Sequence, residues 1–215
     1  SFFFVVHIAE AQQLEQQLDK VYNIDPQLYN GKIFTDFYIG RFGGTQFFSG
    51  AEFQFGDLGL SNKVYKQQGL NYEVYQQKLL LSFKDKIKAE IIIEIPIEHI
   101  RFFYLKNTYF EVISWPDNSY KIFQVFGNDK NKIMIHWRRY LKSNSNAIAN
   151  QRQFSELKKQ IWVLKQGEYY SINNNKSFIN LFDLDQQDAI KKWLKTNQIK
   201  LRNANDEKLQ SLADY

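Results

Sequence analysis

The chain has 215 residues, of which 44% are hydrophobic, 17% aromatic and 24% charged, and it carries a net charge of +5. This composition is typical of a globular protein with a sizeable core, and it excludes collagen-like and Pro/Gly-rich disordered chains. The absence of cysteine excludes disulfides, thiolate metal sites, a cysteine nucleophile and lipid attachment through cysteine, but it does not fix the compartment.

The opening stretch S-F-F-F-V-V-H-I-A-E-A has two interpretations. Phe2–Ile8 is a short apolar run, and Ala9-Glu10-Ala11 fits the small-x-small pattern at which signal peptides are cleaved. The alternative is a buried first strand with every second residue on one face. We predict that 1–11 is a signal-peptide remnant, which would make the protein periplasmic or secreted. No later segment reaches the roughly 18 apolar residues needed to span a bilayer.

A short helix is predicted around Leu14, Leu18 and Val21, ending before Asp25-Pro26. Residues 29–140 then read as strands separated by turn signals. The predicted strands are Lys32–Tyr38, Glu52–Phe55, Lys63–Lys66, Leu70–Tyr75, Leu79–Phe83, Ile91–Ile97, Arg101–Leu105, Tyr109–Ile113, Tyr120–Phe126 and Lys132–Tyr140. The predicted turns between them include Gly56–Gly59, Gln67–Gly69, Lys106–Thr108, Trp115–Ser119 and Gly127–Asn131.

After a polar surface loop at Ser143–Gln153, one more hairpin is predicted to turn at Lys165-Gln166-Gly167. The pattern then changes to short helices. Ser177, Asp185 and Asn205 are predicted to cap their N-termini, because these side chains accept hydrogen bonds from backbone N–H groups that a helix leaves unpaired.

Short spacing between strands favours antiparallel meanders over β-α-β crossovers. The predicted fold is therefore α+β and mainly β, with a meander that forms a sandwich or an open barrel and two or three C-terminal helices. One domain, 12–215, is expected, with its helical segment at 177–215.

Motifs with a strict catalytic meaning are absent, including the phosphate-binding glycine loops, H-E-x-x-H and G-x-S-x-G. The three histidines, His7, His99 and His136, lie far apart and lack carboxylates at metal-ligand spacing. Carboxylate pairs such as Glu90/Glu94 or Asp183/Asp185 could serve a glycosidase only if the fold brought them together. We predict no catalytic residue, no metal site and no cofactor.

Two regions are candidates for contact with a ligand or partner. In H-W-R-R-Y-L-K, a strand would place His136, Arg138 and Tyr140 on one face and Arg139 on the other, so that cationic and aromatic groups could stack on rings and pair with anions. The second region is the phenylalanine-rich loop between Gly40 and Phe55, which includes Phe42, Phe47 and Phe48. For both regions the alternative is an ordinary structural role, as a strand end over the core and as core residues.

Four stretches carry a resemblance to a known group of proteins: Y-N-G-K-I-F (Tyr29–Phe34), G-G-T-Q-F-F (Gly43–Phe48), G-L-N-Y-E-V-Y-Q-Q-K-L-L (Gly69–Leu80) and G-E-Y-Y-S-I-N-N-N-K-S-F-I-N-L-F (Gly167–Phe182). Their order resembles small uncharacterised exported proteins of Bacteroidetes-type bacteria and spans most of the mature chain. The resemblance implies export, a β-rich body and a helical tail, but no active site. Gln77 stands where that group has an acidic residue.

These observations favour an exported, non-enzymatic binding or accessory protein. Its expected partner is an envelope protein, and by analogy with the resembling group an outer-membrane complex. The alternative is an exported hydrolase that acts on glycan or lipid through dispersed carboxylates. Nucleic acid is not an expected partner, because no aromatic RNA-binding signature or long basic arm is present.

Overall fold

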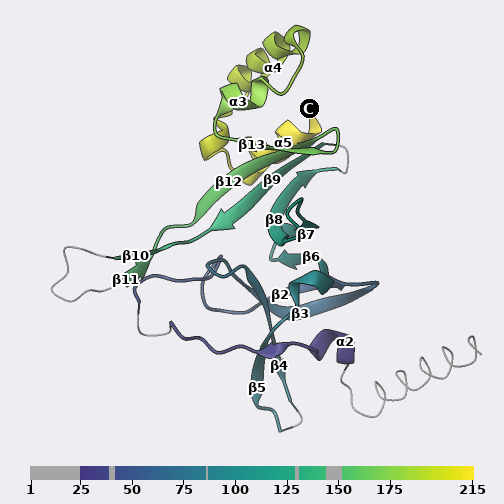
Figure 1. Cartoon of the computed structure of the whole chain (residues 1–215), viewed down its shortest axis with the longest axis vertical. Helices are drawn as coiled ribbons and strands as arrows, with labels where there is room; N and C mark the ends of the chain where they lie inside the picture. The colour runs from purple at the N-terminus through teal and green to yellow at the C-terminus, as the bar shows by residue number, and fades with distance from the viewer. Residues whose placement is uncertain (1–24, 39–41, 86, 129–130, 144–151) are drawn as a thin grey trace, which may run out of the picture.

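The computed structural model describes residues 25–38, 42–85, 87–128, 131–143 and 152–215 (Figure 1). The predicted signal remnant, the predicted helix around Leu14 and most of the predicted loop after Ser143 lie outside these residues. The first half contains α2 (Pro26–Tyr29), β1 (Lys32–Ile33), β2 (Gln54–Leu60), β3 (Lys63–Glu73), β4 (Lys78–Lys84), β5 (Glu90–Glu94), η1 (Ile97–His99), β6 (Ile100–Leu105) and β7 (Thr108–Ser114).

The second half continues the strands and ends in helices. Its elements are β8 (Tyr120–Gly127), β9 (Asn131–Arg138), β10 (Leu141–Ser143), β11 (Arg152–Phe154), β12 (Lys158–Lys165), β13 (Glu168–Ile172), α3 (Asn175–Ile179), α4 (Leu184–Thr196), η2 (Leu201–Asn203) and α5 (Asp206–Asp214). Figure 1 shows α3 and α4 at one end of the molecule, with α2 and β5 at the other.

Eleven strands form one sheet in the order β1-β5-β4-β3-β2-β6-β7-β8-β9-β12-β13, and β10 pairs with β11 separately. Each ladder of the large sheet is antiparallel. The sheet is open, with β1 and β13 as its edge strands. The predicted fold, mainly β and antiparallel with C-terminal helices, is confirmed.

Two predicted turns are wrong, and both lie inside long strands. Residues 56–59 belong to β2, where the glycines provide clearance: a Cβ at Gly56 would lie 1.8 Å from the carbonyl oxygen of Tyr104, and one at Gly59 would lie 2.4 Å from the ring of Phe102. Gln67–Gly69 belongs to β3, where the register against β2 shifts between Gly56 and Leu58. The turn signal at these glutamines therefore marks a β-bulge.

Helix starts also differ from the prediction in detail. Asn174, rather than Ser177, caps α3, and Ser177 completes the capping box three residues later. Helix α4 begins at Leu184, so its N-cap is Asp183 rather than Asp185. The predicted cap of the last helix is confirmed, because the Asn205 side chain accepts a hydrogen bond from the backbone of Lys208 at 3.1 Å.

The core has two main parts on the sheet. Over β2–β8 it is built around aromatic rings, of which Tyr72, Phe103 and Phe110 are fully buried, and the last two stack with their centroids 4.8 Å apart. Over β8, β9, β12 and β13 the helices α3–α5 cover the sheet, burying Phe178, Leu194 and other apolar side chains. Trp137 packs against both parts and joins them.

Strands β8 and β9 diverge after pairing over only four residues of each strand. Beyond this point, two side chains supply hydrogen bonds to backbone carbonyls that the β8–β9 ladder no longer provides. The Nδ1 of His136 is 3.0 Å from the carbonyl oxygen of Ile122, and the Nε2 of Gln77 donates to the carbonyl oxygen of Trp137 at 2.9 Å. Backbone polar groups that would otherwise be buried without partners are thus satisfied where the sheet splits.

Candidate functional site

The predicted strand through Tyr140 ends at Arg138 as β9, and Arg139 and Tyr140 continue to alternate in direction before β10 begins at Leu141. A guanidinium nitrogen of Arg138 lies 3.2 Å from the Nε2 of His136, and its carbon lies 5.9 Å from the ring centre of Tyr140, so these three share one face. Arg139 lies on the other side, where it donates to the carbonyl oxygens of Phe47 and Ser155 at 3.0 and 2.8 Å. The predicted division of the two faces is confirmed.

His136 is buried and held as a neutral imidazole by its partners. The carbonyl of Ile122 can only accept, so Nδ1 carries the proton, and the guanidinium of Arg138 can only donate, so Nε2 accepts. Burial lowers the pKa of His136 below its ordinary value, and the charges of Arg138 and Lys121 lower it further. These contacts give His136 a structural role at the point where the sheet splits.

Replacing His136 with leucine should lower the free energy of unfolding by about 1–3 kcal/mol, because the buried carbonyl of Ile122 loses its donor. The control is Gln160→Leu, an exposed residue directly opposite on β12, which should change stability by no more than about 0.5 kcal/mol. Urea denaturation at pH 7 measures both. Equal losses in the two variants would contradict the role given to His136.

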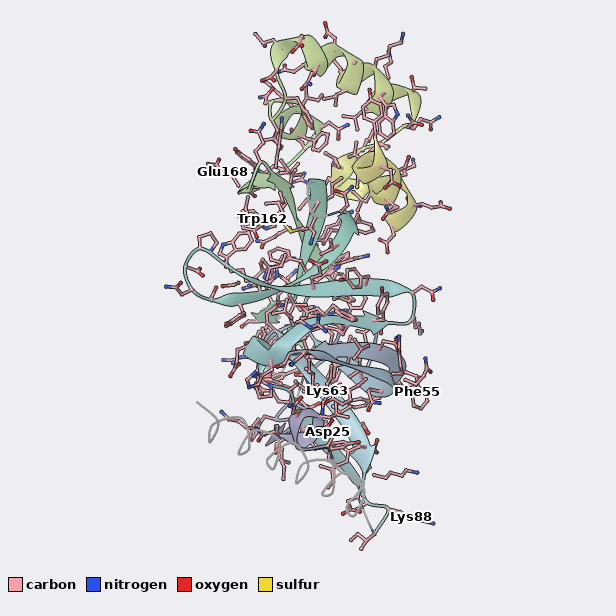
Figure 2. The ribbon with its side chains drawn as sticks, turned by 90° about the vertical axis from the view of Figure 1, so that its right-hand side faces the viewer. Asp25, Phe55, Lys63, Lys88, Trp162 and Glu168 are labelled. Carbon is pink, nitrogen blue, oxygen red and sulfur yellow. The ribbon has the colours of Figure 1, made fainter. Side chains whose placement is uncertain are left out.

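The predicted phenylalanine contacts lie mainly in packed surroundings. Phe47 is 7% exposed, and Phe48 packs against the rings of Phe110 and Trp137. Phe42 is half-buried beside Tyr38 and Phe154. The most exposed ring of this region belongs to Phe55, which is 74% exposed (labelled in Figure 2). A contact role for the three predicted phenylalanines stays a prediction.

A groove of about 760 Å³ lies at the side of β12, next to the end of β13 and to η2. Figure 2 labels Trp162, one of its residues, below α3 and α4. The groove combines cationic, aromatic and polar side chains. Its lining residues are Trp137, Leu157, Lys158, Lys159, Gln160, Ile161, Trp162, Ser171, Ile172, Asn173, Arg202 and Asn203. We call it the basic groove.

The basic groove contains three cations, and no carboxylate is among its lining residues. Across the β9–β12 ladder, Arg138 lies directly opposite Lys158. Two like charges in such a cross-strand pair destabilise the sheet, and an acidic ligand bound beside them would relieve their repulsion. In the part of the chain that the structure describes, neither of these cations nor Arg202 forms an ion pair with a carboxylate. Within the described residues, Lys158 and Arg202 therefore present positive charge to the groove without a carboxylate partner.

Lys159 differs from the other two cations because its ammonium group is engaged. Its Nζ donates to the carbonyl oxygen of Ala204 at 2.7 Å, which joins β12 to the segment before α5. Burial lowers the pKa of Lys159, against the opposing effect of the Asp206 charge. Lys158 and Arg202 are exposed and are the cations best placed to meet a ligand.

None of the contact residues predicted from the sequence is among the residues that line the groove. Arg138 lies at the end of β9, directly opposite Lys158, and Tyr140 follows two residues later, but Lys158, Lys159 and Arg202 were not predicted. A signal was present in the sequence: residues 131–168 hold eight Lys and Arg against two Glu, a net charge of +6 in a chain of +5. Arg202 lacked such a signal, because only the packing of η2 brings it to the strands.

The carboxylates named from the sequence fall in several places. Glu90 accepts from the hydroxyl of Ser82 at 2.6 Å, and Glu94 pairs with Lys78 at 2.7 Å. The exposed side chains of Asp183 and Asp185 line a different cavity, of about 700 Å³, between the helices and the ends of β9 and β12. Among the described residues no group of three or more His, Asp and Glu could hold a metal ion.

Glu73 is a buried carboxylate, 1% exposed, at the end of β3. Its two oxygens accept hydrogen bonds from the backbone N–H groups of Tyr75 and Gln76 at 3.0 and 2.9 Å. Burial raises the pKa of Glu73 to about 7, even though these two hydrogen bonds act to lower it. The Glu73 carboxylate therefore holds the turn that follows β3, and it lines neither the basic groove nor the cavity beside Asp183 and Asp185.

A scan against protein-family models finds no match for the chain, and searches of curated proteins and of solved structures find no similar protein. Within the described residues, no helix combines the length and the apolar character needed to cross a membrane.

Proposed function

We propose that the protein is a non-enzymatic binding protein whose basic groove holds an acidic ligand. The observation that carries this proposal is the lining of the groove, with three cations, two tryptophans and no carboxylate. Cations attract and orient carboxylate, sulfate or phosphate groups, and the indole rings supply apolar contact area. We keep the proposal that the protein is exported and acts in the cell envelope, on the basis of its signal-like first residues.

The alternative, a hydrolase that uses dispersed carboxylates, stays a prediction. The one observation in its favour is that Asp183 and Asp185 line the same cavity. Their side chains are exposed, and most of that cavity is apolar. The basic groove is the better supported site because its charges share one sign and are left unpaired by the described residues.

The test uses fluorescein-labelled poly-L-glutamate and fluorescence anisotropy, at about 20 mM salt and again at about 150 mM, since screening weakens contacts between exposed charges. The wild-type protein should bind, and more weakly at the higher salt. The double variant Lys158→Glu/Arg202→Glu should bind at least about tenfold more weakly, because both exposed cations of the groove then repel the ligand.

The matched control is Lys106→Glu/Lys192→Glu. It changes the net charge by the same amount at two exposed positions, on the β6–β7 turn and on α4, that do not line the groove. Its affinity should stay within about threefold of the wild type. If both double variants lose affinity equally, the binding reflects net charge rather than the groove, and a wild-type protein that does not bind at low salt refutes the proposal.

A further inference from the structure

Strand β13 is shorter than the strand it pairs with, and this leaves part of β12 open. The last pair of their ladder is Ile161 with Ile172, whereas β12 begins three residues earlier, at Lys158. On its other side, β12 continues to pair with β9 as far as Lys158 and Arg138. Residues 158–160 therefore have a strand neighbour on one side only.

The turn between β12 and β13 shows which backbone groups face the open side. Gln166 and Gly167 form a two-residue turn with φ values of 53° and 83°, typical of type I′ hairpins. In such a hairpin the closing pair, here Lys165 and Glu168, exchanges both of its hydrogen bonds. Backbone hydrogen-bonding groups alternate in direction along a strand, so the N–H and C=O of Ile161 point toward β13. Those of Lys159, two residues earlier, point the same way.

The backbone N–H and C=O of Lys159 thus point along the sheet to where β13 has already ended. Even-numbered residues of β12 direct theirs to β9 instead. Among the described residues no partner for these two groups of Lys159 is found. An unpaired donor and acceptor at the side of a sheet are what an added strand binds.

The basic groove surrounds this open side of β12. It is lined by Trp137 and Lys159 from one face of the sheet and by Lys158 and Trp162 from the other. A ligand in it therefore runs along the side of the strand rather than over one face. An extended polypeptide meets both faces, because its side chains alternate between them.

We propose, on the basis of the function proposed above, that the ligand is an acidic, extended polypeptide segment that adds to β12 as a strand in line with β13. Its backbone pairs with the N–H and C=O of Lys159. Its acidic side chains, two residues apart and therefore on one face, meet Lys158 on one side of the sheet or Arg202 on the other. An acidic glycan or a nucleic acid offers the same charge but has no backbone that repeats at the spacing of a β-strand.

The experiment uses the eight-residue peptide Glu-Val-Glu-Val-Glu-Val-Glu-Val, labelled with fluorescein, and the unchanged protein. Two further peptides carry N-methyl groups, one on the amides of all its Glu and the other on those of all its Val. In a strand these two sets of amides face opposite sides. One methylated peptide should lose affinity at least about tenfold, and the other should stay within about threefold of the parent. Fluorescein-labelled heparin and a labelled single-stranded oligonucleotide are titrated in parallel, with the wild type and with the Lys158→Glu/Arg202→Glu variant.

The outcomes separate this inference from the function on which it rests. If both methylated peptides bind like the parent, or both lose affinity equally, strand addition is refuted. Binding that is sensitive to the Lys158→Glu/Arg202→Glu change still upholds an acidic ligand in the basic groove. If heparin or the oligonucleotide binds through the groove and the parent peptide does not, the partner is not a polypeptide. If none of the probes binds, the proposed function itself fails.

Discussion

Replacing Gly56 with alanine should lower the free energy of unfolding by about 3 kcal/mol or more, or prevent folding altogether. The new Cβ would lie 1.8 Å from the carbonyl oxygen of Tyr104 and 2.9 Å from its carbonyl carbon. Both atoms belong to the backbone of β6, so no side chain can rotate to make room. Either β2 or β6 must move, in the middle of the sheet.

The control for this substitution is Gly43→Ala. A Cβ at Gly43 would have its nearest neighbour, the Cβ of Gln153, at 3.4 Å, an ordinary contact. That variant should lose less than about 1 kcal/mol. Urea denaturation measures both, with circular dichroism to report whether the Gly56 variant folds at all. A folded Gly56→Ala protein with stability near that of the control would contradict the close approach of β2 and β6.

Glu73 should make the protein less stable as the pH rises from about 5 to about 7. Burial raises its pKa in the folded state to about 7, from the ordinary value of 4.5. Between these values the folded protein holds a proton that the unfolded chain has released, so stability falls as pH rises. The full difference corresponds to about 3 kcal/mol.

The variant Glu73→Gln should remove this slope. His136 acts in the opposite direction, because its lowered pKa adds stability as the pH rises toward its unfolded value of about 6.5. The measurement is therefore the difference between wild type and variant in urea denaturation at several pH values from 5 to 8. The control Glu98→Gln, at an exposed residue of η1, should keep the wild-type slope. A slope that Glu73→Gln leaves unchanged would contradict the assignment.

Local signals in the sequence predicted much of the fold. The turns at Lys106-Asn107 and Gln166-Gly167 were predictable because a hairpin turn depends on residues next to one another. Gly56 and Gly59 misled the prediction, because a glycine that makes a turn and a glycine that lets another strand approach look alike in sequence. Only the sheet order, with β2 beside β6, distinguishes the two uses.

The candidate site depends on relations that no local pattern contains. The alternation of His136, Arg138 and Tyr140 followed from the two-residue period of a strand. The exposed backbone of Lys159, in contrast, depends on how far β13 extends along β12, and Arg202 comes from a segment after α4. Register and packing place these groups together, so the structure was needed to find the groove.

The order of the strands has a consequence for how the chain folds. Only three ladders of the large sheet join strands that do not follow one another in the chain: β1–β5, β2–β6 and β9–β12. Within β2–β5 and within β6–β9, each strand pairs with the next strand in the chain. These hairpins can form one after another, and each closes only a short loop, which costs little conformational entropy. Docking of β2 on β6 must then bring together distant parts of the chain, and closing such loops is what slows the folding of β-proteins. This docking step is therefore where the folding barrier of the first half is expected to lie.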